Sequence, residues 1–139
     1  MKRFVILLIA GVLVLSFITI EEMSATDGRW KLIDSSKMGK QFYDTESIMY
    51  TSPSMVKVWI RVEVTEGFWE MMGVRSDRAL WEIDCQNRLY RTLQRDSVKK
   101  DGTSAVTKEP SVWEDIPPES NPEFLMDTLC KQSPKKKAR

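Results

Sequence analysis

The feature that most constrains the fold is an alternating stretch at residues 56–64. It reads Val-Lys-Val-Trp-Ile-Arg-Val-Glu-Val, with a β-branched residue at every second position. Side chains alternate between the two faces of a β-strand, so one face of this segment is apolar and the other is polar. β-branched side chains also suit a pleated sheet better than a helix. The stretch therefore predicts the central strand of an antiparallel sheet, with Lys57, Trp59 and Arg61 on its solvent-facing side.

The N-terminal segment has the layout of a secretory signal peptide. Lys2 and Arg3 precede a nearly continuous apolar run at residues 4–20, and two glutamates follow it. Cleavage after Ala25 would remove residues 1–25. The alternative is an uncleaved membrane anchor, although the run is slightly shorter than the roughly 20 apolar residues that span a bilayer. We therefore expect an exported protein of the periplasm or cell surface, which contacts a membrane only if this segment is retained.

The remaining chain is expected to form one domain at residues 26–134, followed by a basic, disordered tail at residues 135–139. Lysines and arginines number 21 and acidic residues 20, which gives a net charge of +1. Nucleic-acid-binding domains usually carry a strong basic excess, so no nucleic-acid partner is expected. The chain has no histidine, the commonest general base and metal ligand. We accordingly expect neither a metal nor a cofactor.

Two cysteines, Cys85 and Cys130, connect the predicted sheet to a predicted helix. Alternation over residues 78–85 directs Cys85 to the inner face of a strand. Residues 120–123 have the form of a capping box and predict a helix over 121–131, with Cys130 on its apolar stripe. A disulfide between the two cysteines satisfies both patterns and suits an exported chain. Two free buried thiols are the alternative if the chain is not exported.

The predicted fold class is α+β: a single antiparallel sheet of about five or six strands, with a C-terminal α-helix packed across it and tied by the disulfide. A turn signal at residues 100–102 separates the last two strands, and the segment from 110 to 118 is expected to be irregular. Besides the central strand, further strands are expected at residues 30–33, 41–43, 78–85, 88–94 and 103–107.

Several short motifs follow one another along the predicted domain. They are Phe42-Tyr43-Asp44-x-x-Ser47-Ile48, Val58-Trp59-Ile60-Arg61, Glu82-Ile83-Asp84-Cys85, Arg88-x-Tyr90-Arg91, Trp113-x-x-Ile116-x-Pro118-x-Ser120 and Leu129-Cys130. Their order, together with the cysteine pair, resembles the bacterial surface-adhesin protein E family. The resemblance implies a secreted or envelope domain, a sheet joined to a C-terminal helix by a disulfide, and adhesion to host extracellular proteins. The namesake adhesin is lipid-anchored, whereas this chain has no cysteine near the end of its apolar run.

Two stretches carry side chains typical of protein-binding surfaces. In the first, Trp59 lies between Lys57 and Arg61 on the solvent-facing side of the central strand. Large aromatic and cationic residues often dominate binding energy, so this trio is a candidate binding site. The alternative is that the helix or another chain covers Trp59.

The second stretch contains Phe68, Trp69 and Met71 between turn signals at Gly67 and Gly73. Tryptophan and methionine are enriched at interfaces, which favours an exposed patch that contacts a partner. The alternative is a short strand or lid that packs on the core.

Catalytic chemistry finds little support in the sequence. Glu82 and Asp84 share one face of a predicted strand, but outward-facing acids are usually just solvated. Asp84 and Cys85 are neighbours along a strand and point to opposite faces, so they cannot act as a pair. The sequence contains no phosphate-binding glycine loop and no metal-ligand cluster.

The sequence therefore predicts a secreted or periplasmic, non-enzymatic binding module of the bacterial envelope with a protein partner. The alternative is a structural or accessory envelope protein that acts through homo-oligomerisation. A hydrolase without histidine is a third, weaker hypothesis.

Overall fold

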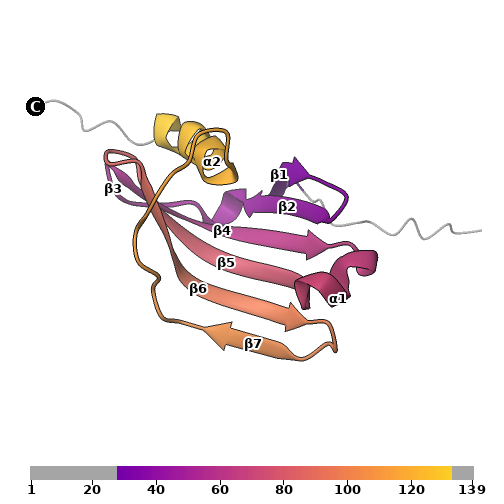
Figure 1. Cartoon of the computed structure of the whole chain (residues 1–139). Coiled ribbons are helices and arrows are strands. Elements are labelled where there is room, and N and C mark those ends of the chain that lie inside the picture. Colours follow the sequence, from indigo (N-terminus) through magenta and orange to yellow (C-terminus); the bar gives the residue numbers. More distant parts are fainter. Residues whose placement is uncertain (1–27, 133–139) are drawn as a thin grey trace, which may run out of the picture.

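The structure, a computed structural model, describes residues 28–132 and consists of one antiparallel sheet and a C-terminal helix (Figure 1). The predicted signal peptide and basic tail lie outside the described residues. The strands run in the order β1-β2-β4-β5-β6-β7, with β3 paired to β4 and β8 paired to β6. Their bounds are β1 (Trp30–Ser35), β2 (Gly39–Asp44), β3 (Met49–Ser52), β4 (Met55–Val64), β5 (Val74–Asp84), β6 (Leu89–Lys99), β7 (Ser104–Thr107) and β8 (Glu114–Asp115).

The helical segments are short except for the last one. The helix α2 (Asn121–Leu129) is continued by the 3₁₀ turn η3 (Cys130–Gln132). The connection from β4 to β5 is made by η2 (Glu66–Phe68) and the single turn α1 (Trp69–Met72), and η1 (Thr45–Ser47) follows β2. None of the described helices has the length and apolar character needed to cross a membrane.

The predicted α+β class is confirmed, but the predicted count of five or six strands was wrong because the sheet has eight. The two strands without a sequence signal are β3 and β8, and both are short. β8 consists of Glu114 and Asp115, which are both exposed. Such strands exist through backbone pairing with β4 and β6, so they carry no alternating apolar pattern that periodicity could detect.

The core lies between the sheet and α2. Val56, Val58 and Ile60 of β4 are almost fully buried, as the alternation predicts. Their β5 partners across the strands are Ile83, Trp81 and Ala79. Leu125, Met126 and Leu129 of α2 complete the cluster. We call this side of the sheet the inner face and the side turned away from α2 the outer face.

Polar contacts fix the beginning of α2. The Ser120 hydroxyl accepts a hydrogen bond from the Glu123 N–H at 3.3 Å, as the capping box predicts. The Glu123 carboxylate reaches back to the Glu119 N–H at 2.7 Å and also pairs with Arg88 at 2.7 Å. These contacts place the first turn of α2 beside the β5–β6 connection.

The end of α2 is held by a covalent bond. Cys85, the residue after β5, forms a disulfide with Cys130, and their Cα atoms lie 5.7 Å apart. The Tyr50 hydroxyl donates to the Leu129 carbonyl at 2.7 Å, so β3 holds the same end of the helix. The predicted disulfide is confirmed, and α2 is attached to the sheet at both of its ends.

Asp44 at the end of β2 is a buried carboxylate. The Arg29 guanidinium donates to both of its oxygens, at 2.8 and 2.7 Å, and the Glu46 N–H donates at 3.0 Å. The hydrogen bond from Arg29 is the main reason that the pKa of Asp44 is lowered, and the Glu46 N–H adds to the effect. Asp44 therefore joins the first described residues to η1.

We expect Asp44→Asn to lower the free energy of unfolding by about 2 kcal/mol at neutral pH, because charge-assisted hydrogen bonds are lost at a buried site. A lowered pKa stabilises the folded state above the ordinary aspartate value of 3.8. This stabilisation disappears as the pH falls through the folded pKa. Urea unfolding of both proteins from pH 7 to pH 2 measures the difference, which should shrink at acidic pH. The exposed Asp34→Asn is the matched control, and an equal loss in both variants would contradict the expectation.

Candidate functional site

The outer face brings together side chains from five strands. Residues that pair across an antiparallel sheet point to the same side, so the register defines the members of this face. Leu32 pairs with Phe42, which pairs with Arg61 of β4. The members of this face include Trp30, Leu32, Phe42, Lys57, Trp59, Arg61, Arg78, Leu80, Glu82 and Arg91.

Arg61 lies between two aromatic rings on the outer face. Its guanidinium carbon is 4.6 Å from the Trp30 ring centre and 5.1 Å from that of Phe42. The guanidinium also pairs with Glu63 at 3.0 Å. Cation–π contacts of this kind orient a guanidinium and shield it in part from water. Arg61 is thus held in one orientation at the β1–β2–β4 side of the outer face.

Two further arginines stack on tryptophans across the same face. Arg78 lies over Trp59 at 4.9 Å, and Arg91 lies over Trp113 at 4.4 Å. Trp113 comes from the segment between β7 and β8, so this row of stacks extends from β1 to β6 and the segment before β8. We call these three groups, centred on Arg61, Arg78 and Arg91, the arginine–aromatic row.

Glu82 lies within this row and is buried, with 6% of its surface exposed. Its carboxylate pairs with Arg91 at 2.6 Å and with Lys57 at 3.7 Å. The expectation of a solvated Glu82 was wrong because the cations of the two neighbouring strands cover it. The ion pairs hold Lys57 and Arg91 in position, which leaves Glu82 a structural role.

Asp84, the other acid of the same stretch, stabilises the turn that follows β5. Its carboxylate accepts hydrogen bonds from the backbone N–H groups of Gln86 and Asn87, at 2.9 and 3.0 Å, and from the Asn87 side chain at 2.7 Å. Burial alone would raise the pKa of Asp84, but these hydrogen bonds outweigh it and lower the pKa. Glu82 and Asp84 have separate partners, and neither is arranged as an acid–base pair.

The structure places Lys57, Trp59 and Arg61 of the first candidate site together on the outer face. Trp59 is half-buried, and the group stacked on it is Arg78, while α2 packs against the inner face. The alternation of the central strand assigns the three side chains to this face correctly. Trp30, Phe42, Arg78, Arg91 and Trp113 carry no local sequence signal that would join them to it, because their proximity depends on strand register.

The second candidate site is a single helical turn at the end of the sheet where β4 passes to β5 (Figure 1). Phe68 and Trp69 are half-buried, and the Trp69 indole donates to the Val64 carbonyl at 2.9 Å. Arg75 lies over the Trp69 ring at 4.5 Å. Only Met71 of the three is exposed, at 65%. The alternative of a short strand was wrong, because the stretch forms a helical turn. Phe68 and Trp69 pack on the end of the sheet, whereas Met71 and Met72 are exposed.

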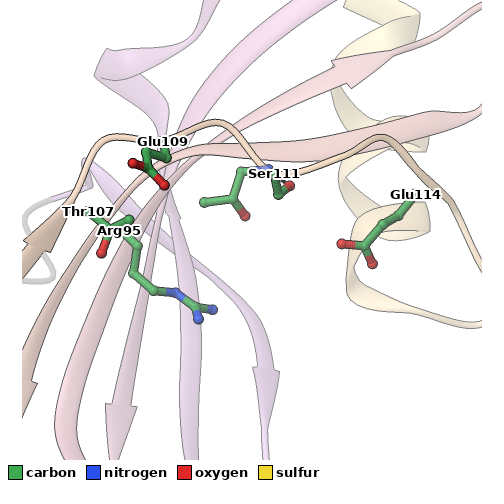
Figure 2. Close-up of a pocket in the computed structure, with 6 residues that line it drawn as sticks. Arg95, Thr107, Glu109, Ser111 and Glu114 are labelled. Atoms are coloured by element: carbon green, nitrogen blue, oxygen red, sulfur yellow. Dashed lines mark hydrogen bonds between the residues drawn. The ribbon is translucent and has the colours of Figure 1, made fainter.

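A polar pocket of about 340 Å³ lies between β6 and the segment that follows β7 (Figure 2). Among its side chains, Arg95 extends into the open space that Glu109 and Glu114 border. Residues 110–118 have no regular pattern in the sequence, and no sequence signal indicates this pocket. Its lining residues are Thr92, Arg95, Thr107, Glu109, Ser111 and Glu114.

Within residues 28–132, no group of three or more histidine, cysteine or acidic side chains could hold a metal ion. The polar clusters of this part of the chain instead consist of ion pairs and guanidinium–aromatic stacks.

The disulfide-tied sheet with one helix on its inner face defines a small α+β domain with an outer face rich in arginine and tryptophan. The chain belongs to the Surface-adhesin protein E family, whose model matches residues 30–131. The resemblance suggested by the sequence motifs is thus confirmed, and the protein is adhesin-like.

Two solved structures of protein E show a similar fold. The first, from Haemophilus influenzae, is 15% identical with a TM-score of 0.54, and the match covers 79% of this chain and 89% of that one. The second, from non-typeable Haemophilus influenzae, is 19% identical with a TM-score of 0.51, covering 72% of this chain and 75% of that one. No curated protein matches the sequence.

Proposed function

We propose that this protein is an exported, non-enzymatic binding module of the bacterial envelope that binds a protein partner through its outer face. The family supports an adhesin-like role. The arginine–aromatic row is the observation that carries the choice of surface. It places Arg61, Arg78 and Arg91 with tryptophan and phenylalanine rings on the side of the sheet away from α2.

The physical reason is that the row is ordered before any partner arrives. Arginine and tryptophan are the residues that most often dominate the energy of protein interfaces. A long arginine side chain normally loses conformational entropy when a partner immobilises it. Stacking on Trp59 and pairing with Glu82 already restrict Arg78 and Arg91, which reduces that loss. A partner with carboxylate and apolar groups fits such a surface.

Export is part of the proposal. Residues 1–25 act as the signal peptide, residues 26–134 form the adhesin-like domain, and residues 135–139 are a basic tail. The disulfide between Cys85 and Cys130 supports this location, because stable disulfides form outside the reducing cytoplasm. The predicted location is therefore the periplasm or the cell surface.

Trp59→Ala and Arg78→Ala are each expected to weaken partner binding at least tenfold, because both break the same stack at the middle of the outer face. Binding can be measured by interferometry on a panel of immobilised extracellular matrix proteins. Phe124→Ala is the matched control, since Phe124 is an exposed aromatic residue of α2. Circular dichroism verifies that each variant is folded.

The proposal fails if folded Trp59→Ala and Arg78→Ala proteins bind like the wild type. It fails equally if Phe124→Ala alone removes binding, because the contact would then involve the helix side. Loss in both outer-face variants with an unchanged control supports the proposed surface.

Homo-oligomerisation through a sheet edge is the second candidate function. It is favoured by β7, an edge strand that pairs with β6 and whose four residues are all exposed. A sizing column distinguishes an oligomer paired through a sheet edge from one paired through the outer face. The edge-paired oligomer would keep its size in Trp59→Ala, whereas the face-paired oligomer would not.

A further inference from the structure

We infer that the pocket beside β6 is a second binding site, which takes a saccharide unit that is neutral or amino-substituted rather than acidic. This site lies apart from the outer face. Thr92 pairs with Trp81 and Arg95 pairs with Ala79, so both lining residues point to the inner side of the sheet. The inference therefore does not depend on the protein-binding surface proposed above.

The pocket is built by a strand and by a segment bound to it. The Thr92 N–H donates to the Ser111 hydroxyl at 3.0 Å, and the Ser111 N–H donates to the Thr92 carbonyl at 2.8 Å. After this contact the chain reaches β8, whose Glu114 pairs with Tyr90 of β6. Between Thr107 and Ser111 the segment forms the outer wall (Figure 2). These two contacts thus keep the segment after β7 beside β6.

Two of the three charged side chains that line the pocket, Arg95 and Glu114, have ion-pair or hydrogen-bond partners. The Arg95 Nε lies 3.1 Å from Asp77, and Asp77 also accepts a hydrogen bond from the Ser97 hydroxyl at 2.6 Å. Glu114 accepts a hydrogen bond from the Tyr90 hydroxyl at 3.3 Å. The terminal nitrogens of Arg95 extend into the open space (Figure 2). A hydrogen-bond donor and a hydrogen-bond acceptor therefore lie on different sides of the pocket.

The lining chemistry selects the class of ligand. All six lining residues are polar, and they comprise three hydroxyls, two carboxylates and one guanidinium. Carboxylates accept hydrogen bonds and a guanidinium donates them, so a ligand whose groups both donate and accept can satisfy the whole lining. Sugar hydroxyls have this property. The volume of about 340 Å³ lies at the small end of the range for ligand pockets.

The charge of the lining residues restricts the class of ligand further. Glu109 and Glu114 outnumber the single cation Arg95, which is itself paired with Asp77. An acidic sugar or a phosphate would be repelled, whereas a neutral or amino-substituted sugar would not.

The test is a titration of the purified protein with three disaccharides, followed by the backbone amide signals in NMR spectra. The probes are the disaccharides of N-acetylglucosamine, of glucosamine and of galacturonic acid. We expect saturable shifts at Thr92 and Ser111 with the first two probes and at least tenfold weaker binding of the acidic one. The double variant Glu109→Ala/Glu114→Ala should weaken binding of the first two probes at least tenfold.

The matched control is Glu66→Ala/Asp127→Ala, which removes the same charge at two exposed positions outside the pocket. Unchanged binding in this control, with loss in the pocket variant, supports the site. Absence of saturable shifts at Thr92 and Ser111, equal binding of the acidic probe, or full binding in the pocket variant each overturns the inference. Loss of partner binding by the outer-face variants has no bearing on these results.

Discussion

Removal of the disulfide through Cys85→Ala/Cys130→Ala is expected to lower the free energy of unfolding by about 4 kcal/mol. The two cysteines are separated by 45 residues, so the bond restricts a long loop of the unfolded chain. For a domain of this size such a loss is a large share of the stability, which is typically about 5–15 kcal/mol. Urea unfolding under oxidising conditions measures the difference between wild type and variant.

Reduction of the wild-type protein is the control for the double variant. Unfolding of the wild type in the presence of a reductant should give nearly the stability of Cys85→Ala/Cys130→Ala. The hydrogen bond from Tyr50 to the Leu129 carbonyl remains in both cases and keeps the end of α2 near the sheet. A loss below about 1 kcal/mol would mean that the disulfide adds little to a helix already held by its packing.

Leu125→Ala is expected to lower the free energy of unfolding by about 3 kcal/mol, the second-largest effect among these predictions. Leu125 is fully buried and belongs to the cluster that joins α2 to the central strand. Alanine would leave a cavity between the helix and the inner face, and a close-packed core relaxes only in part around such a cavity. Chemical unfolding followed by tryptophan fluorescence provides the measurement.

Phe124→Ala, one position earlier on α2, serves as the comparison because 44% of Phe124 is exposed. Its change in stability should be clearly smaller than that of Leu125→Ala. Similar losses in the two variants would show that α2 does not face the sheet with Leu125 and would contradict the placement of the core.

The parts of the fold that follow local periodicity could be predicted from the sequence. The alternation over residues 56–64 identifies β4 and its buried face, and the spacing of Leu125 and Leu129 identifies the apolar side of α2. These patterns need only the sequence of one element. The disulfide follows because two such patterns, at Cys85 and Cys130, point into the same core.

The features that depend on the pairing of distant strands could not be predicted. Glu82 was expected to be solvated, but Lys57 and Arg91 cover it from neighbouring strands. The stack of Arg91 on Trp113 joins residues whose proximity depends on the path of the segment after β7. The polar pocket also depends on contacts between distant segments, since hydrogen bonds with Thr92 bring Ser111 beside β6. Sequence spacing contains no information on such contacts.

The two faces of the sheet have different roles in this account. The part of the inner face that α2 covers provides stability, and the disulfide keeps α2 in place. The outer face holds the arginine–aromatic row and is proposed to meet a protein partner. This division of roles explains why a small sheet can bind a partner on one face and still have a buried core.

The central claim is that an exported domain presents its outer face while a closed disulfide keeps α2 on the inner face. Cell fractionation combined with thiol alkylation and non-reducing gels tests this claim most directly. The account predicts a protein in the envelope or external fraction, without its N-terminal segment, whose cysteines react only after reduction. A cytoplasmic protein with two freely reactive thiols at Cys85 and Cys130 would contradict it.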